Sequence, residues 1–454
     1  MSSSIFFQGG TLVLQNTEET TLVPPPFQFV KHRWRCEAYH YKSVLPWLRE
    51  HHVHSSVPRW SHLKLKLSDS RELYDYQAEA LNAWKQADKK GSVVLPTGSG
   101  KTLVALHAIL DVHSSAVVIV PTLNLLYQWY AILTNAFKTE IGVYYNSEKL
   151  VLPLTIATYH SAGDLIAAHG NTFKLLIFDE VHHLPAKTWG ETALMSPAPF
   201  RLGLTATYPE EYEQTGDRWQ LDDLIGPIVY TQRIELLVGK QLAEYRTQRI
   251  RVDLTPEERS TYDAAYEIYT AFIRERGLRR SHGPGWLREL MRLSAFDTQA
   301  RGALLARQKL LKIVNSCQGK FAALEHLLHE HNSERILIFT ESNSVAYTIA
   351  QKYLIPVISH ETGVAERKHI LDSFQSGHYS AIVTSKVLNE GVDVPEAKVA
   401  IVLGGSSSKR EYIQRLGRIL RKKEPLQAVL VEVLARKTIE EGKVQRRHVR
   451  KENR

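Results

Sequence analysis

The 454-residue sequence contains only two cysteines, Cys36 and Cys317, which argues against a disulfide scaffold and suits a reducing compartment. It also lacks any run of the roughly 18 apolar residues that a membrane span needs, so we expect no membrane partner. The N-terminal stretch MSSSIFFQGGTLVLQ has neither a basic region nor a cleavage-like segment, and it therefore predicts no signal peptide.

Positive charge is what the sequence has in excess. The net charge is +9, and the isoelectric point is near 9.2. A basic balance favours nucleic acid or another anionic surface as partner. Residues 436–454 alone carry a net charge of +5. The ordinary interpretation of such a tail is a solvated segment, and the alternative is a tail that touches phosphates without reading sequence.

Short apolar runs separated by longer helix-like segments dominate the chain from residue 71 onward, and the same rhythm restarts after residue 310. Uninterrupted apolar strands that alternate with helices predict an α/β fold with parallel sheets covered on both faces. We therefore expect two α/β domains of similar size. The strand candidates are Val93–Leu95, Ala116–Val120, Leu154–Ala157, Leu175–Phe178, Leu202–Leu204, Ile336–Phe339, Val357–Ile358, Ala381–Val383, Val399–Leu403 and Ala428–Leu434.

Residues 1–70 have the composition of a small separate unit. Gly9-Gly10 lies between two apolar runs and predicts a hairpin, and Tyr41–Glu50 has a helical pattern. Three histidines fall within His51–His54. They are candidate metal ligands, but no cysteine or carboxylate cluster lies beside them, and a surface loop is the preferred interpretation.

The segment between the two α/β halves, roughly Asp253–Arg307, is helical and highly charged. Tyr262, Tyr266, Tyr269 and Phe272 recur at helical spacing and fall on one face of a helix. Packing in a core is the ordinary interpretation of such a face. The alternative is an aromatic surface on which nucleic-acid bases stack.

The stretch LPTGSGKT, Leu95–Thr102, follows one strand candidate and precedes a helix candidate, which is the setting of a phosphate-binding loop. Glycines let the backbone approach phosphates, the lysine reaches the β- and γ-phosphates, and the threonine hydroxyl ligates Mg²⁺. One departure is that Leu95 stands where such loops usually have their first glycine. The predicted nucleotide-binding residues here are Thr97, Gly98, Ser99, Gly100, Lys101 and Thr102.

An acidic pair ends the apolar run LLIFDEVHH. Asp179 is placed to hold Mg²⁺, and Glu180 is placed to orient and deprotonate the attacking water. Phosphoryl transfer also needs positive charge at the transition state. Arg418 and Arg421, in EYIQRLGRILRKK, are the candidates for that charge.

These stretches together resemble a superfamily-2 helicase of the DExH kind. Tyr76-Gln77 resembles the adenine-reading motif, and PTGSGKT, VPTLNLLYQW, TIATYHS, DEVHH, LTATY, ILIFTES, TSKVLNEGVDVPEA and QRLGRILR resemble the following motifs in the right order. Within that superfamily, DEVHHLPA, APFRLGLTAT and SKREYIQRLGRILR are most similar to the compact archaeal and bacterial XPB helicases.

The resemblance implies roles for further residues. Gln77 would read adenine, Asp393 and Gln414 would also meet the nucleotide, and His183 would be a packed neighbour of the site. The residues implied to couple the state of ATP to the grip on DNA are His182, Thr205, Ala206 and Thr207. The residues implied to contact nucleic acid are Thr122, Thr158, Tyr159, Thr384 and Gly391, with Tyr262 and Tyr266 from the helical segment.

The resemblance also implies an architecture: an N-terminal damage-recognition-like α+β domain, two RecA-like motor domains and a helical thumb. We expect the N-terminal domain at residues 1–70, the first motor domain at 71–250, the thumb at 251–308 and the second motor domain at 309–440. A basic tail is expected at 441–454. The implied function is an ATP- and Mg²⁺-dependent DNA helicase or translocase of 3′-to-5′ polarity that acts in DNA repair. If the source is bacterial or archaeal, the protein is expected in the cytoplasm with the nucleoid.

One departure from the family concerns strand separation. Many members carry an Arg-Glu-Asp triplet shortly after the LTATY motif, where this chain reads YPEEY, Tyr208–Tyr212. Two alternatives therefore stay open beside an unwinding helicase: a duplex translocase, and an ATP-switched damage-binding scaffold that recruits a nuclease partner. An RNA helicase is a third alternative, because such motors grip mainly the phosphate backbone and their motifs do not separate DNA from RNA.

Overall fold

A computed structural model describes residues 3–15, 23–68, 71–186, 189–209, 219–237, 245–385, 397–404 and 428–441. The chain divides into two compact units, Met1–Leu236 and Leu237–Arg454. Within the described ranges, no helix is long and apolar enough to cross a membrane. No cluster of three or more histidine, cysteine, aspartate or glutamate side chains in those ranges could hold a metal ion, and this includes the histidines at residues 51–54.

The first unit begins with a five-stranded sheet in the order β3-β4-β2-β1-β5. The predicted hairpin at Gly9-Gly10 is present, because β1 and β2 pair antiparallel on either side of it. The predicted helix is α1, and it closes a small apolar core over the sheet. The elements are β1 (Ser4–Gln8), β2 (Thr11–Gln15), β3 (Gln28–Val30), β4 (Arg33–Glu37), α1 (Tyr41–Glu50) and β5 (His54–Ser55).

An eight-stranded sheet in the order β13-β6-β12-β11-β7-β10-β8-β9 forms the rest of the first unit. All neighbouring strands are parallel except the β8–β9 pair. The elements are α2 (Asp75–Gln86), β6 (Lys90–Val94), α3 (Lys101–Val112), β7 (Ala116–Val120), α4 (Leu123–Phe137), β8 (Gly142–Tyr145), β9 (Glu148–Leu150), β10 (Leu154–Thr158), α5 (Tyr159–His169), β11 (Leu175–Asp179), α6 (Gly190–Leu194), β12 (Phe200–Thr205), α8 (Leu221–Leu224), β13 (Ile228–Thr231) and α9 (Ile234–Leu237).

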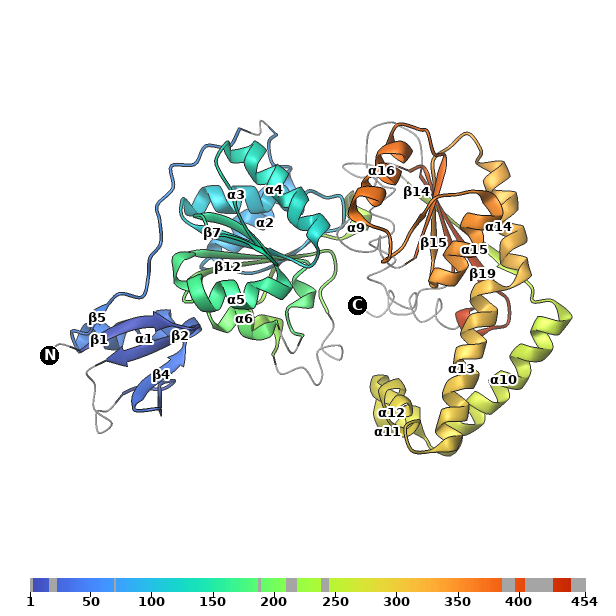
Figure 1. Cartoon of the computed structure of the whole chain (residues 1–454), viewed down its shortest axis with the longest axis horizontal. Coiled ribbons are helices and arrows are strands. Elements are labelled where there is room, and N and C mark those ends of the chain that lie inside the picture. The colour runs from blue at the N-terminus through green and yellow to red at the C-terminus, as the bar shows by residue number, and fades with distance from the viewer. Residues whose placement is uncertain are drawn as a thin grey trace. The chain divides into compact units, whose positions relative to one another are not determined.

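Helices cover both faces of this sheet: α3 and α4 lie on one face, and α5 and α6 lie on the other (Figure 1). The central strands β7, β10 and β11 are buried along their whole length, as their uninterrupted apolar runs predicted. In this fold class, ligands bind outside the carboxyl ends of the strands. We therefore expect the functional site among the residues at the carboxyl ends of β6, β7, β10, β11 and β12.

The second unit has a six-stranded parallel sheet in the order β14-β19-β18-β15-β17-β16. Helices α14 and α15 cover one face, and α16 covers the other (Figure 1). The elements are β14 (Tyr245–Val252), α14 (Gln318–Glu330), β15 (Ile336–Thr340), α15 (Asn343–Tyr353), β16 (Val357–Ile358), α16 (Val364–Gln375), β17 (Ala381–Thr384), β18 (Val399–Leu403) and β19 (Ala428–Ala435). The two predicted α/β halves are both present.

Helices α10 (Pro256–Glu275), α11 (Leu278–His282), α12 (Trp286–Leu293) and α13 (Thr298–Ser316) fill the segment expected to be a thumb. Thr255 begins α10 through a reciprocal bond pair with Glu258, in which each side chain accepts the other residue's backbone N–H. Tyr262, Tyr269 and Phe272 are buried in the core of this segment. Core packing, the ordinary interpretation, therefore accounts for most of the aromatic face.

Two expected domain boundaries differ from the structure. β14 pairs with β19 over its whole length, so residues 245–250 belong to the second sheet and not to the first motor domain that was expected to end at residue 250. α13 continues to Ser316, past the expected thumb boundary at 308. Periodicity within β14 could not reveal its partner, because strand pairing is a tertiary property.

The N-terminal sheet is attached to the motor sheet through a cation–π contact. The Tyr39 ring meets the Lys90 ammonium at 5.1 Å and the Arg201 guanidinium at 4.5 Å. Arg201 is fully buried and donates to the carbonyl oxygens of Leu224 and Ser196 at 2.7 and 3.1 Å. Tyr39 therefore joins the small domain to the start of strands β6 and β12.

Replacing the Tyr39 ring should loosen this attachment. We expect Tyr39→Ala to lower the free energy of unfolding of the first unit by about 1–3 kcal/mol, because two cation–π contacts and their packing are lost. Urea denaturation followed by tryptophan fluorescence measures the change. Tyr39→Phe keeps the ring and should unfold like the wild type, and equal losses in the two variants would contradict this role.

Lys90 gives this junction a pH dependence. Burial lowers the pKa of the Lys90 ammonium from 10.5 to about 8, assisted by the nearby charges of Arg201 and Lys42 and opposed by Asp88. Between those pH values the unfolded chain holds this proton more tightly than the folded chain, so the contribution of Lys90 to stability rises with pH. We expect Lys90→Met to raise the melting temperature at pH 7 and to lose that advantage towards pH 10. A constant difference over this range would contradict the prediction.

Candidate active site

The carboxyl ends of five parallel strands bring distant parts of the sequence together. β6 leads into the loop at Leu95, β7 into Thr122 and β10 into Thr158, while β11 ends at Asp179 and β12 at Thr205. The paired registers place all five ends at one edge of the sheet. The predicted phosphate loop, acidic pair and coupling residues therefore share a single edge.

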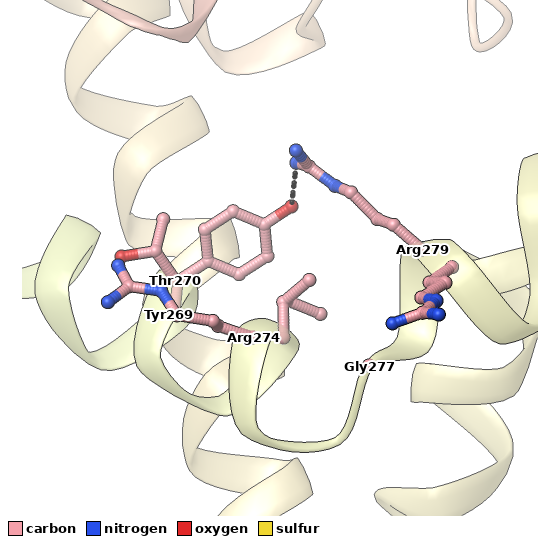
Figure 2. A pocket seen from close by; sticks show the side chains of 7 residues that line it. Tyr269, Thr270, Arg274, Gly277 and Arg279 are labelled. Carbon is pink, nitrogen blue, oxygen red and sulfur yellow. Dashed lines mark hydrogen bonds between the residues drawn. The ribbon is translucent and has the colours of Figure 1, made fainter.

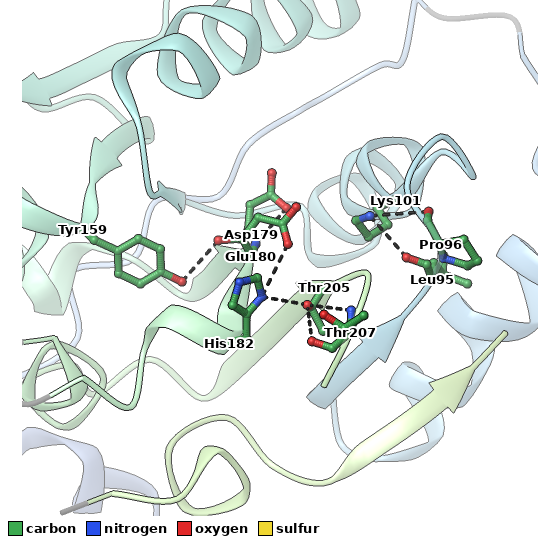
Figure 3. A network of polar contacts seen from close by, with 9 residues as sticks. All are labelled: Leu95, Pro96, Lys101, Tyr159, Asp179, Glu180, His182, Thr205 and Thr207. Atoms are coloured by element: carbon green, nitrogen blue, oxygen red, sulfur yellow. Dashed lines mark hydrogen bonds and ion pairs between the residues drawn. The ribbon is translucent and has the colours of Figure 1, made fainter. Parts of the chain in front are cut away.

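The backbone of the phosphate loop is turned as phosphate binding requires. Gly98 and Gly100 have φ angles of +82° and +80°, which side-chain-bearing residues rarely adopt. Gly100 begins α3, so the N-terminal N–H groups of that helix face the loop. The Lys101 ammonium donates to the carbonyl oxygens of Leu95 at 3.2 Å and Pro96 at 3.5 Å (Figure 3).

This loop fits the phosphates of a nucleotide. The Thr97 hydroxyl is buried and has no hydrogen-bond partner among the described residues. Among the described residues, the hydrogen bonds of the Lys101 ammonium go to neutral carbonyl oxygens, which an anionic phosphate can displace because its bonds to an ammonium are stronger. Thr102 lies in the first turn of α3. The chain's own residues thus offer the loop amides, Lys101 and Thr102 to a phosphate chain.

Tyr76 and Gln77 of helix α2 stabilise this loop by hydrogen bonds to its backbone. The Tyr76 hydroxyl and the Gln77 amide both donate to the Ser99 carbonyl oxygen, at 2.6 and 2.7 Å. The other end of the Gln77 amide accepts the Tyr74 backbone N–H at 3.0 Å, and Gln77 is buried. Both ends of the amide are therefore used within the protein. The adenine contact expected of Gln77 stays a prediction.

Asp179 is a buried carboxylate held by three polar groups. Its Oδ2 accepts the indole N–H of Trp129 at 2.9 Å, and its Oδ1 accepts the Glu180 backbone N–H at 3.0 Å. Burial raises the pKa of Asp179, and the Trp129 bond, the Lys101 charge and the Glu180 N–H act to lower it. A carboxylate oxygen suits a divalent cation, and the neighbouring Lys101 ammonium suits the phosphates that such a cation accompanies.

Glu180 begins a polar chain that leads to β12. Its backbone is left-handed, with φ +49° and ψ +53°, a strained conformation for a residue with a side chain. The Glu180 carboxylate lies 3.5 Å from His182 Nδ1, which also contacts Thr205 Oγ1 at 3.0 Å. Thr205 Oγ1 in turn donates to the Thr207 carbonyl oxygen at 2.8 Å and accepts the Thr207 N–H at 3.1 Å (Figure 3).

These bonds fix the tautomer of His182. The single proton of the Thr205 hydroxyl goes to Thr207, so the contact with His182 needs a proton on Nδ1. The same N–H points towards Glu180, and the acidic strand end is joined to the end of β12. His183 packs against the rings of Tyr159, His182 and Trp189, as its expected role of packed neighbour requires.

Comparison with known proteins identifies the family. Over 372 residues, the chain is 41% identical to the "DNA 3'-5' translocase XPB2" of Sulfurisphaera tokodaii, an alignment that covers 82% of this chain and 83% of that protein. The chain belongs to the XPB family. It is also 31% identical to the "DNA 3'-5' helicase XPB" of Kineococcus radiotolerans, over 78% of this chain and 58% of that protein.

Further comparisons cover a more distant relative, the two sheet-containing parts of the chain and the fold. The yeast "General transcription and DNA repair factor IIH helicase/translocase subunit XPB/SSL2" is 27% identical, over 80% of this chain and 41% of that protein. Two family models match: "Type III restriction enzyme, res subunit" at residues 70–210 and "Helicase conserved C-terminal domain" at 319–423. The Hef helicase domain of Pyrococcus furiosus has the same fold, with a TM-score of 0.51 at 19% identity, over 82% of this chain and 97% of that one.

The residues expected to contact nucleic acid in the XPB motor fall into two groups. Thr122 and Thr158 lie at the starts of α4 and α5, at the same carboxyl edge as the phosphate loop. Tyr159 is buried and donates to the Asp179 carbonyl oxygen at 3.2 Å, so it supports the acidic strand end and is not exposed to DNA. The hydroxyl of Thr384 is likewise buried, and it donates to the Ser385 carbonyl oxygen at 2.9 Å.

In the helical segment, the two tyrosines that were expected to contact DNA differ in their exposure to solvent. Tyr262 is only 2% exposed, and its hydroxyl accepts the Ile439 N–H at 2.8 Å, so its ring is not available for base stacking. Tyr266 is 43% exposed. Nearby, a pocket of about 420 Å³ is lined by basic side chains, among them Arg274 and Arg279 (Figure 2).

Part of the predicted site falls outside the described residues. These positions are Gly391, Asp393, Gln414, Arg418 and Arg421. Their predicted roles in nucleotide and DNA contact stay predictions from the sequence.

Two groups in the first unit escaped the sequence-based prediction. Trp129 lies in the quoted VPTLNLLYQW motif and Tyr76 in the adenine-reading motif, but neither was assigned a contact. Each donates a hydrogen bond to a residue distant in the sequence: Trp129 to the Asp179 carboxylate, and Tyr76 to the Ser99 carbonyl oxygen. Aromatic polar tips buried in an ATPase motif are a signal that could have singled them out, because a buried indole N–H or phenol needs a partner.

The Thr205 hydroxyl should matter to turnover more than to nucleotide binding. Thr205→Val keeps the shape and removes three hydrogen bonds, and we expect kcat with saturating DNA to fall about tenfold or more while KM for ATP changes little. Steady-state ATP hydrolysis measures both constants. Thr205→Ser should restore most of the rate, and a Val variant with wild-type turnover would contradict the coupling role.

Proposed function

We propose that this chain is an ATP-driven DNA motor that moves 3′ to 5′ and serves DNA repair. The observation that carries the proposal is the sharing of one sheet edge by the phosphate loop, the acidic pair and the threonines at the starts of α4 and α5. Membership of the XPB family, whose named relatives are DNA 3′–5′ translocases and helicases, supports the direction and the substrate.

The chemistry assigned to the site is ATP hydrolysis. Bound MgATP supplies the phosphoryl group and the cation that neutralises its developing charge. Lys101 and the loop amides hold the β- and γ-phosphates, while Thr102 and Asp179 are the residues that would hold the cation. Glu180 takes the proton of the attacking water. In this proposal Arg418 and Arg421 supply further positive charge.

Contact with DNA is proposed through its backbone. Thr122 offers a hydroxyl, and the backbone amides at the starts of α4 and α5 are common donors to phosphate oxygens. Thr158 itself is 6% exposed, and its hydroxyl donates to Ser161 Oγ at 3.4 Å, so its contact is proposed through the helix amides. In the helical segment, exposed Tyr266 and the pocket containing Arg274 and Arg279 offer an aromatic surface and cations. Such contacts do not read base sequence, so affinity should fall steeply as salt increases.

Translocation is better supported than unwinding. The sequence YPEEY stands where many XPB proteins have Arg-Glu-Asp, and a relative that is 41% identical over 82% of this chain is named a translocase. A duplex translocase is therefore the second candidate function. A nuclease partner and a place in the cytoplasm beside the nucleoid remain further proposals, motivated by the family resemblance.

The test measures ATP hydrolysis with single-stranded, forked and duplex DNA, together with strand displacement on the same fork. We expect DNA to stimulate hydrolysis many-fold and Lys101→Ala to abolish it, because phosphate charge is left unpaired. Displacement only of a strand reached by 3′-to-5′ movement would establish an unwinding motor, and stimulation without displacement would favour the duplex translocase.

Two outcomes would redirect the proposal. Stimulation by RNA equal to that by DNA would favour the RNA helicase alternative, since backbone contacts alone do not distinguish strongly between them. Tight, nucleotide-dependent DNA binding without stimulated hydrolysis would favour the ATP-switched scaffold. Retention of full DNA-stimulated hydrolysis by Lys101→Ala would exclude this site as the source of the activity.

A further inference from the structure

A buried indole joins helix α4 to the acidic strand end. Trp129 is 1% exposed, and its N–H donates to Asp179 Oδ2 at 2.9 Å. The bond crosses 50 residues of sequence and links α4, which packs on β7 and β10, to the end of β11. Since Asp179 Oδ1 is already held by the Glu180 N–H, the indole fixes the remaining freedom of the carboxylate group.

The same helix begins at the edge where DNA is proposed to bind. Thr122 caps α4 by accepting the Leu125 N–H at 3.3 Å. Trp129 follows Thr122 by seven residues, or about 10 Å along the axis at 1.5 Å per residue. Two turns of one helix therefore separate the DNA-facing threonine from the indole that holds Asp179.

The outer side of α4 is partly exposed. The stretch Leu123–Phe137 contains no charged residue. Leu123, Tyr127 and Tyr130 are exposed by 38%, 47% and 41%, while Leu126, Trp129 and Leu133 are buried beneath them. The helix thus has one side buried beside Asp179 and another side exposed, on which Tyr127 bonds to Tyr145 at 2.8 Å.

We propose that Trp129 is a positioning residue for Asp179, and that α4 transmits the binding of DNA at Thr122 to this carboxylate. The inference rests on the proposed function, and it adds the regulation of the ATP site. DNA that shifts α4 moves the indole, and the indole reorients the carboxylate that would hold Mg²⁺. Stimulation by DNA then has a physical route through a single rigid element.

The experiment uses Trp129→Phe in the full chain, which keeps most of the ring and removes the donor. Without DNA, a fluorescent ATP analogue is titrated with Mg²⁺. We expect the half-saturating Mg²⁺ concentration to rise about tenfold, the scale of a lost hydrogen bond to a charged group. With DNA, we expect the ratio of stimulated to basal hydrolysis to fall by a similar factor.

A matched control is available in Trp84→Phe. Trp84 is also 1% exposed, and its indole N–H donates to the Arg201 carbonyl oxygen at 2.8 Å, near the amino end of β12. Loss of this bond should cost comparable stability in the same unit. It should leave the Mg²⁺ requirement and the stimulation ratio unchanged, because Trp84 does not contact Asp179.

The outcomes distinguish the role of Trp129 from the motor function of the chain. If DNA stimulates wild type and Trp129→Phe equally and their Mg²⁺ requirements agree, the role of Trp129 is overturned while the motor function stands. If DNA does not stimulate the wild type, the proposed function itself fails. Equal defects in the two tryptophan variants would assign the effect to general destabilisation and would also overturn the inference.

A second measurement keeps the proposal testable if Trp129→Phe does not fold. Hydrogen exchange is followed in the wild type with Mg²⁺ and a non-hydrolysable ATP analogue, with and without single-stranded DNA. We expect DNA to change the protection of α4 and of the end of β11 together, by several-fold. A change at the start of α4 that leaves Asp179 and Glu180 unaltered would overturn the link.

Discussion

The structure of the first unit depends on one geometric constraint: parallel strands end at the same edge of their sheet. Because β6, β7, β10, β11 and β12 are parallel and in register, segments more than a hundred residues apart in sequence arrive side by side. The phosphate loop, Asp179 and Thr205 need no special loops to find one another. The strands themselves are buried and apolar, so the scaffold is rigid while its edge carries the polar chemistry.

A buried carboxylate at that edge is costly unless it is fully engaged, since desolvation disfavours its charged form. Asp179 is engaged by Trp129, by a backbone N–H and by the charge of Lys101. The adjacent Glu180 takes up a strained backbone and continues the polar chain towards His182 and β12. Trp129 on α4 bonds to Asp179 at the end of β11, and His182 bonds to Thr205 at the end of β12, so a displacement of one of these elements changes the next. That property is what an ATPase coupled to a nucleic acid requires.

The sequence predicted the two parallel sheets well, because runs such as Ala116–Val120 and Val399–Leu403 are continuous, apolar and fully buried. The phosphate loop and acidic pair were also predictable, since their chemistry restricts residue type and spacing. What could not be predicted depends on tertiary contacts. β14 joins the second sheet through pairing that its own pattern does not encode, and Tyr262 turns into the core while Tyr266, four residues later, stays exposed. The amide of Gln77 also supports the phosphate loop through the Ser99 carbonyl oxygen, a contact that the adenine-reading motif does not specify.

The central claim is that nucleotide and DNA occupy one edge and therefore affect each other's binding. The most direct measurement is the affinity for a short single-stranded DNA, at fixed salt, with no nucleotide, with ADP and with a non-hydrolysable ATP analogue, together with the reciprocal nucleotide titrations. Linkage predicts that DNA affinity differs between nucleotide states by a factor of about 5 to 150, and that DNA changes nucleotide affinity by the same factor. An affinity for DNA that is equal in all three states would contradict the account.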